Sequence, residues 1–105
     1  MWIDAIRRQV AADGGFAMVL AKGDEIAGAV ILVMRTRDNL VSAYARTNMG
    51  DGQVEWRALM ENEAESSGKL HEALEKQRRF DPDLWLIELD IADPARFIAE
   101  LPQMS

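Results

Sequence analysis

The order of elements in this chain is decided by residues 78–90, which read Arg78-Arg79-Phe80-Asp81-Pro82-Asp83-Leu84-Trp85-Leu86-Ile87-Glu88-Leu89-Asp90. Residues 84–89 are a nearly unbroken apolar run, which predicts a strand that needs cover on both faces. The Asp-Pro-Asp segment before this run ends the helical pattern upstream, because proline lacks an amide hydrogen and restricts the residue before it. The stretch therefore predicts a helix end, a rigid turn and a buried strand.

The composition is that of an ordinary globular domain. Of the 105 residues, 49% are hydrophobic and 29% are charged, and these fractions are far from those of disordered chains. The chain has no cysteine, which excludes disulfide bonds, thiolate metal sites and cysteine nucleophiles. We predict one domain over residues 1–105, which is long enough to bury its own core.

The charge and the apolar runs limit the partners that we expect. The formal net charge of −6 disfavours non-specific binding to nucleic acid, because phosphate contacts need an excess of lysine and arginine. The first residues do not show the pattern of an export signal. The longest apolar run, residues 26–34, is about half as long as a membrane-spanning helix. We therefore expect a cytoplasmic protein with neither a nucleic-acid nor a membrane partner.

Hydrophobic spacing predicts three helices and five strands. Apolar residues recur at helical spacing in residues 2–10, in residues 66–79 after a serine cap, and in residues 94–101 after an Asp-Pro pair. Apolar and β-branched runs predict strands over residues 16–21, 26–35, 40–46, 54–60 and 84–89. The predicted class is α+β, with a mainly antiparallel sheet of about five strands and with the element order α-β-β-β-β-α-β-α.

The first two strands are predicted to be antiparallel neighbours. The segment between them contains Gly23 and charged residues, which is typical of a short hairpin loop. Polar or glycine-containing turns separate the next strands, so the first four strands are predicted to form a meander. Because the second strand is apolar on both faces, it is predicted to lie in the middle of the sheet.

Three segments together resemble a known protein family. They are Gly23-Asp24-Glu25-Ile26-Ala27-Gly28-Ala29-Val30, the pair Trp56-Arg57, and Phe80-Asp81-Pro82-Asp83-Leu84-Trp85. Over most of its length the chain is similar to a family of small, uncharacterised alphaproteobacterial proteins classed as a domain of unknown function. The resemblance implies one compact bacterial domain and carries no catalytic residue with it.

His71 is the only histidine, and it precedes Glu75 by four residues on the predicted second helix. Because side chains at this spacing share a helical face, His71 and Glu75 can approach one metal ion together. A zinc-protease motif would have a second histidine at the position of Glu75. The nearby Lys69, Lys76 and Arg78 favour an ordinary solvated helix. We predict no metal and no cofactor, and keep a small enzyme or metal-binding domain centred on His71 as the alternative.

Other candidate motifs favour structure over chemistry. Asp81 and Asp83 flank a proline, where an aspartate typically accepts backbone hydrogen bonds in a turn. No serine lies in a Gly-x-Ser-x-Gly setting, and the glycine-containing segments lack the Gly-Lys-Ser/Thr ending of a phosphate-binding loop. We therefore expect that the chain is not an enzyme.

The remaining candidate is a surface of the sheet. If the odd-numbered residues 41–45 face the core, alternation places Tyr44 and Arg46 on the outward face of the third strand, beside Glu55 and Arg57 on the fourth. Tyrosine and arginine are enriched at binding hot spots, although such a cluster is also common on a solvated sheet. The leading prediction is a non-catalytic module that binds another protein, or a copy of itself, through this sheet face or an exposed edge strand.

Overall fold

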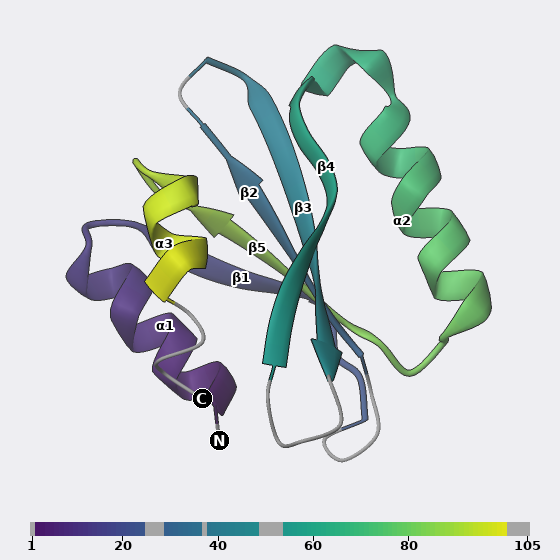
Figure 1. Ribbon diagram of the computed structural model, residues 1–105, viewed down its shortest axis with the longest axis horizontal. Coiled ribbons are helices and arrows are strands. Elements are labelled where there is room, and N and C mark those ends of the chain that lie inside the picture. The colour runs from purple at the N-terminus through teal and green to yellow at the C-terminus, as the bar shows by residue number, and fades with distance from the viewer. Residues whose placement is uncertain (1, 25–28, 37, 49–53, 101–105) are drawn as a thin grey trace.

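The computed structural model describes residues 2–24, 29–36, 38–48 and 54–100. Its elements are α1 (Trp2–Ala12), β1 (Phe16–Ala21), β2 (Val30–Arg35), β3 (Leu40–Asn48), β4 (Val54–Ala64), the 3-10 helix η1 (Glu65–Ser67), α2 (Lys69–Phe80), β5 (Trp85–Asp90) and α3 (Pro94–Glu100). Figure 1 shows the sheet between α2 on one side and α1 and α3 on the other. The α+β class and the predicted order of helices and strands are confirmed. None of the described helices is both long enough and apolar enough to cross a membrane.

The strand order in the sheet is β1-β5-β2-β3-β4. β5 runs antiparallel to β1 and parallel to β2, whereas β2 with β3 and β3 with β4 are antiparallel pairs. The sheet is mainly antiparallel and β2 lies in its middle, as predicted. The predicted pairing of the first two strands is wrong, because β5 lies between them, and the meander is limited to β2, β3 and β4. Residues 25–28 of the predicted hairpin loop lie outside the described residues.

The hydrophobicity of β5 and of the residue before it explains this insertion. Five of the residues 84–89 are buried, namely Leu84, Trp85, Leu86, Ile87 and Leu89. A strand that is apolar on both faces is stabilised by cover on both faces, and a place between two other strands also satisfies both of its backbone edges. Two apolar runs joined by a glycine-containing loop indicate two strands with opposite directions, and this much is correct for β1 and β2. The loop does not specify that the two strands are adjacent.

Two apolar cores lie on opposite faces of the sheet. The first core, on the side of α1 and α3, contains Ile6, Val10, Val30, Leu32, Met34, Tyr44, Trp85, Ile87, Leu89, Ile91 and Phe97. The second core, on the side of α2, contains Ile31, Val33, Ala43, Leu84 and Leu86, and Leu70 and Leu74 of α2 pack against it. Alternate residues of β2 and β5 therefore enter different cores, which is why apolar residues occupy both sets of alternating positions in these two strands.

The start of β5 is joined closely to the segment that follows β1. A Cβ atom on Gly23 would lie 2.2 Å from the carbonyl oxygen of Asp83, so a side chain at this position requires the backbone to move. The N–H of Asp24 donates a hydrogen bond to the Asp83 carbonyl at 2.9 Å. The indole N–H of Trp85 donates to the Asp24 carbonyl at 3.0 Å. These contacts hold the chain against β5 at the point where it leaves β1.

Asp81 fixes the turn between α2 and β5. One of its carboxylate oxygens accepts a hydrogen bond from the N–H of Asp83 at 3.0 Å, and the other accepts one from the N–H of Ala29 at 3.2 Å. Its own N–H donates to the carbonyl of Gln77 at 2.9 Å. The turn role predicted for Asp81 is therefore confirmed, and it extends to the residue that precedes β2.

Candidate functional site

Tyr44 does not lie on a solvated sheet face. Its side chain belongs to the first core, and the residue is only 8% exposed. Burial raises the pKa of the Tyr44 phenol, the carboxylate of Glu61 raises it further, and the side chain of Ser42 acts in the opposite direction. The phenol therefore stays neutral at physiological pH. The predicted binding role is not supported for this side chain, which is a packing residue.

The other three residues of the predicted cluster lie on two different faces of the sheet. Arg46 is the register partner of Trp56, which packs against the first core. Arg57 is the register partner of Ala45, which packs against the second core, and alternation places Glu55 on the same face as Arg57. The expectation of one outward face that carries all four residues is therefore wrong. The physical reason is that helices cover the sheet on both faces, so residues 41–44 of β3 are buried whichever face they point to.

His71 and Glu75 lie together on the exposed surface of α2, as predicted. The distance between His71 Nε2 and Glu75 Oε1 is 3.2 Å. Within the described ranges, no group of three or more histidine, aspartate or glutamate side chains is placed to hold a metal ion. The pair therefore offers two ligands, whereas structural zinc sites use four and catalytic sites use three from the protein.

We expect His71→Gln to leave both the fold and the metal content of the protein unchanged, because an exposed pair of ligands holds a metal ion weakly. The measurement is elemental analysis of protein purified without chelators, with Glu75→Gln as the matched variant. Thermal unfolding of both variants checks that the fold is kept. Stoichiometric zinc or manganese in the wild type, lost in both variants, would contradict this prediction and favour the metal-binding alternative.

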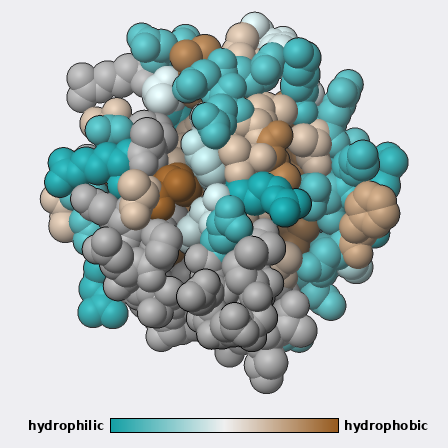
Figure 2. Space-filling view, in the orientation of Figure 1, coloured by the Kyte–Doolittle hydropathy of each residue, from teal (hydrophilic) through white to brown (hydrophobic). Residues whose placement is uncertain are grey.

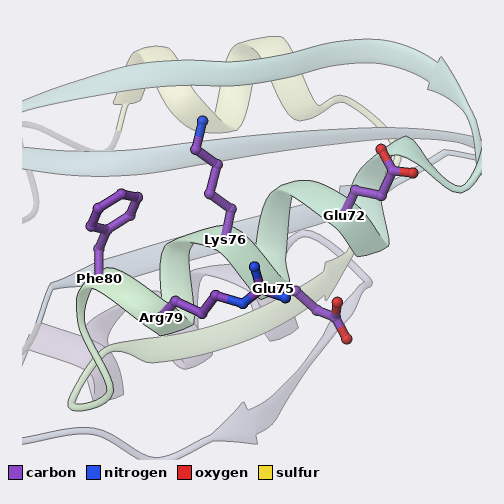
Figure 3. A pocket seen from close by; sticks show the side chains of 5 residues that line it. All are labelled: Glu72, Glu75, Lys76, Arg79 and Phe80. Carbon is purple, nitrogen blue, oxygen red and sulfur yellow. The ribbon is translucent and has the colours of Figure 1, made fainter.

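A hollow of about 540 Å³ lies on the outer surface of α2. Its described lining consists of Glu72, Glu75, Lys76, Arg79 and Phe80, and Figure 3 shows that Lys76 and Phe80 project to the same side of the helix. Ligand sites usually collect a few polar groups from several elements around an apolar cavity. Here the described lining comes from one helix, and four of its five side chains are charged. As far as the described residues line it, the hollow is a gap between long side chains on one helix.

The two edges of the sheet differ in their chemistry. The edge strand β4 carries several charged or polar residues, namely Glu55, Arg57, Glu61, Asn62 and Glu63, and its register with β3 is irregular at two points. Charges and bulges on edge strands prevent pairing with other chains. In Figure 1, β4 crosses in front of β3, and Figure 2 shows hydrophilic residues beside a group of more hydrophobic ones on the described part of this side. The β4 edge is therefore protected.

The β1 edge lacks this protection. β1 reads Phe-Ala-Met-Val-Leu-Ala and contains no charged residue and no proline. Within the described part of the chain it pairs with β5 alone, so its other backbone edge is open towards every described segment. Its register with β5 is irregular only near its end, between Val19 and Ala21. Strands of this kind are templates for pairing with a further strand.

Three large apolar side chains of β1 are exposed. Phe16 is 57% exposed, Met18 51% and Leu20 46%, whereas Ala17 and Val19 pack against the first core. Alternation therefore places Phe16 and Met18 on the sheet face that α2 covers farther along the sheet. We call the open backbone of Phe16–Ala21, together with the side chains of Phe16, Met18 and Leu20, the β1 edge. Exposed apolar groups beside open backbone are typical of interaction sites, which makes the β1 edge the candidate site.

The sequence contained a signal for this site that the sequence analysis did not use. An exposed edge strand was among the predicted binding surfaces, but no strand was named for it. Residues 16–21 form a predicted strand without a charged residue, which is unusual for a strand at an edge. The signal was not decisive, because the place of the fifth strand in the sheet was unknown.

Comparison with known proteins places the chain among proteins of the same size and fold. A family model described as a protein of unknown function (DUF1491) matches residues 1–99. No curated protein matches the chain. The solution structure of protein Atu0922 from A. tumefaciens is 29% identical, covers 93% of this chain and 88% of that one, and has a TM-score of 0.81.

Two further similar structures come from Caulobacter crescentus CB15, and both are of DUF1491 family proteins. The crystal structure is 31% identical, covers 91% of this chain and 89% of that one, and has a TM-score of 0.76. The NMR structure is 30% identical, covers 92% of this chain and 87% of that one, and has a TM-score of 0.76. The similarity therefore extends over nearly the whole of each protein.

Proposed function

We propose that this chain, which belongs to the DUF1491 family of proteins of unknown function, is a non-catalytic module that binds another polypeptide along the β1 edge. The family membership confirms the resemblance found in the sequence. The observation that carries the proposal is an open, uncharged edge strand with three exposed apolar side chains. A strand added to a sheet gains main-chain hydrogen bonds from the open edge and specificity from the side chains beside it. The β1 edge offers both.

The attachment of β1 to β5 also supports this role. A Cβ atom on Gly15 would lie 2.1 Å from the carbonyl oxygen of Asp90, and one on Gly23 would lie 2.2 Å from that of Asp83. The chain is thus packed closely against β5 just before β1 and shortly after it. Binding to a preformed surface costs less conformational entropy than binding that has to order the surface first. The β1 edge is held in the extended form that a further strand needs.

Affinity capture with two matched variants tests the proposal. Met18→Lys puts a charge into the β1 edge, as protected edge strands have. Phe80→Lys makes the same kind of change at a residue that is 79% exposed and lies outside β1. An untagged copy of the chain is included among the polypeptides offered. We expect wild type and Phe80→Lys to retain the same polypeptides, and we expect Met18→Lys to retain at least about tenfold less of them. Thermal unfolding within a few degrees of wild type shows that the variants are folded.

Amide hydrogen exchange then locates the contact on the bound protein. We expect exchange to slow in residues 16–21, because new main-chain hydrogen bonds protect the amides on the open side of β1. If no retained polypeptide depends on Met18, or if exchange in residues 16–21 is unchanged in the complex, the β1 edge is not the binding site. Binding by a metal-dependent site at His71 would instead be sensitive to His71→Gln.

A further inference from the structure

We infer that the polypeptide bound at the β1 edge is a second copy of this chain. This inference rests on the proposed function and adds the partner. Two β1 strands pair in antiparallel fashion about a twofold axis, and two five-stranded sheets thereby become one continuous sheet. In such an interface the same surface of each copy meets itself, which is the commonest arrangement in protein dimers.

β1 can pair with itself so that its exposed side chains face one another. A twofold axis at Met18 places Met18 opposite Met18 of the second copy, Phe16 opposite Leu20, and Ala17 opposite Val19. The exposed side chains of both copies then meet one another, and the smaller side chains that pack against the first core also meet one another. A shift by one residue would set exposed side chains against inward-facing ones. A shift by two residues would keep this match, but the pairing centred on Met18 is the one that sets all three exposed side chains opposite one another.

Oppositely charged residues flank β1 at its two ends. Lys22 directly follows β1, Asp13 lies in the turn between α1 and β1, and both are exposed, so antiparallel pairing brings the Lys22 end of one copy towards the Asp13 end of the other. The twofold axis repeats this arrangement at the other end of the paired strands. Two chains that each carry a net charge of −6 repel one another at long range. The opposite charges at the two ends offset part of this repulsion and favour the antiparallel orientation.

The carboxylate nearest to the middle of β1 is paired within its own chain. Glu88 of β5 is the register partner of Met18, and its side chain is only 23% exposed. The guanidinium group of Arg35 donates one hydrogen bond to Glu88 and another to Glu65. Without this arginine, a Glu88 carboxylate from each copy would flank the two Met18 side chains. The pairing keeps unbalanced negative charge away from the centre of the dimer.

The contact is small, and this sets the strength that we expect. Stable interfaces bury roughly 1,200–2,000 Å² of surface. The area buried by one strand edge and three large side chains from each copy lies at most at the lower end of this range. We therefore expect the monomer and the dimer to exchange, with a Kd on the order of micromolar. A dimer of this strength is visible as a change of mass with concentration.

Sedimentation of the wild type, Met18→Lys and Phe80→Lys tests the dimer. Over concentrations from about 1 µM to 1 mM, we expect wild type and Phe80→Lys to move from the monomer mass of 11.8 kDa towards twice this mass. Met18→Lys should leave the monomer mass only at concentrations at least about tenfold higher than wild type, because two like charges would face one another across the axis and raise the Kd. A wild type that stays at 11.8 kDa throughout, or a Met18→Lys variant that dimerises equally, overturns the inference.

Single cysteine variants test the register, since the chain has no cysteine of its own. Directly opposite residues in antiparallel strands have Cα atoms about 4.5–5.5 Å apart, which a disulfide can bridge. We expect mild oxidation to link Met18→Cys chains covalently and to link Leu20→Cys chains much more slowly, because Leu20 lies opposite Phe16 and not opposite itself. Equal rates for the two variants overturn the register.

The two levels of the proposal can fail separately. If affinity capture finds a polypeptide that depends on Met18 while the wild type remains a monomer, the partner is a different protein, and only the second copy is excluded. If capture also finds no Met18-dependent polypeptide, the β1 edge has no binding role and the proposed function fails with it.

Discussion

We expect Trp85→Ala to lower the free energy of unfolding by about 3–5 kcal/mol. Trp85 is 6% exposed and contributes its ring to the first core, so its loss leaves a cavity that the surrounding strands can fill only in part. The substitution also removes the hydrogen bond from the indole N–H to the Asp24 carbonyl. Because small domains are stable by about 5–15 kcal/mol, much of the stability is lost. Chemical denaturation followed by fluorescence or circular dichroism measures the change.

Two variants make this result specific. Trp56 also packs against the first core but is only partly buried, so Trp56→Ala should cost clearly less than Trp85→Ala. Trp85→Phe keeps most of the buried apolar area and loses only the N–H donor, so it should fall between wild type and Trp85→Ala. A loss below about 1 kcal/mol for Trp85→Ala, or a larger loss for Trp56→Ala, would contradict the packing described above.

Gly23→Ala is expected to destabilise the protein by about 1–3 kcal/mol or more. The added Cβ would lie 2.2 Å from the carbonyl oxygen of Asp83 and 2.6 Å from the carbonyl carbon of Leu84. Both neighbours are backbone atoms, so no side chain can rotate to make room, and the segment after β1 has to move away from β5. The hydrogen bond from the N–H of Asp24 to Asp83 should weaken with it.

The matched control is Lys22→Ala, which introduces the same residue at the neighbouring, exposed position. It should change the stability of the monomer by less than about 0.5 kcal/mol when both variants are measured at low concentration. Hydrogen exchange of the Asp24 amide should become faster in Gly23→Ala and stay unchanged in Lys22→Ala. Equal stabilities of the two variants would show that the close approach at Gly23 is not a constraint on the fold.

The burial of β5 could be predicted from the sequence, but its neighbours in the sheet could not. Apolar residues at both alternating positions of 84–89 require cover on two faces, and this is a local property of the strand. Pairing depends on main-chain hydrogen bonds, which every strand can form. The glycine-containing loop after β1 therefore predicted the opposite directions of β1 and β2 correctly, while the insertion of β5 between them depended on long-range contacts.

The candidate site divides in the same way. Alternation correctly predicted that Tyr44 and Arg46 share a face, because this follows from the geometry of an extended backbone. Whether that face is wet depends on α1 and α3, which are distant in the sequence and cover it. The β1 edge is the opposite case, because its lack of charge is visible in the sequence of residues 16–21 and its exposure becomes visible only when the sheet order is known.

The place of β5 also orders the events of biosynthesis. β2, β3 and β4 can pair as soon as residue 64 has left the ribosome, but β1 has to wait for β5, because Phe16 pairs with Asp90, a separation of 74 residues. Contacts between such distant segments form slowly, because closing a long loop costs conformational entropy before the contact contributes any stabilisation. During this interval the nascent chain displays an uncharged apolar strand with both backbone edges unpaired, which is the kind of segment that misassembles or recruits chaperones. The rate at which β5 inserts therefore determines how long each new chain can misassemble through β1.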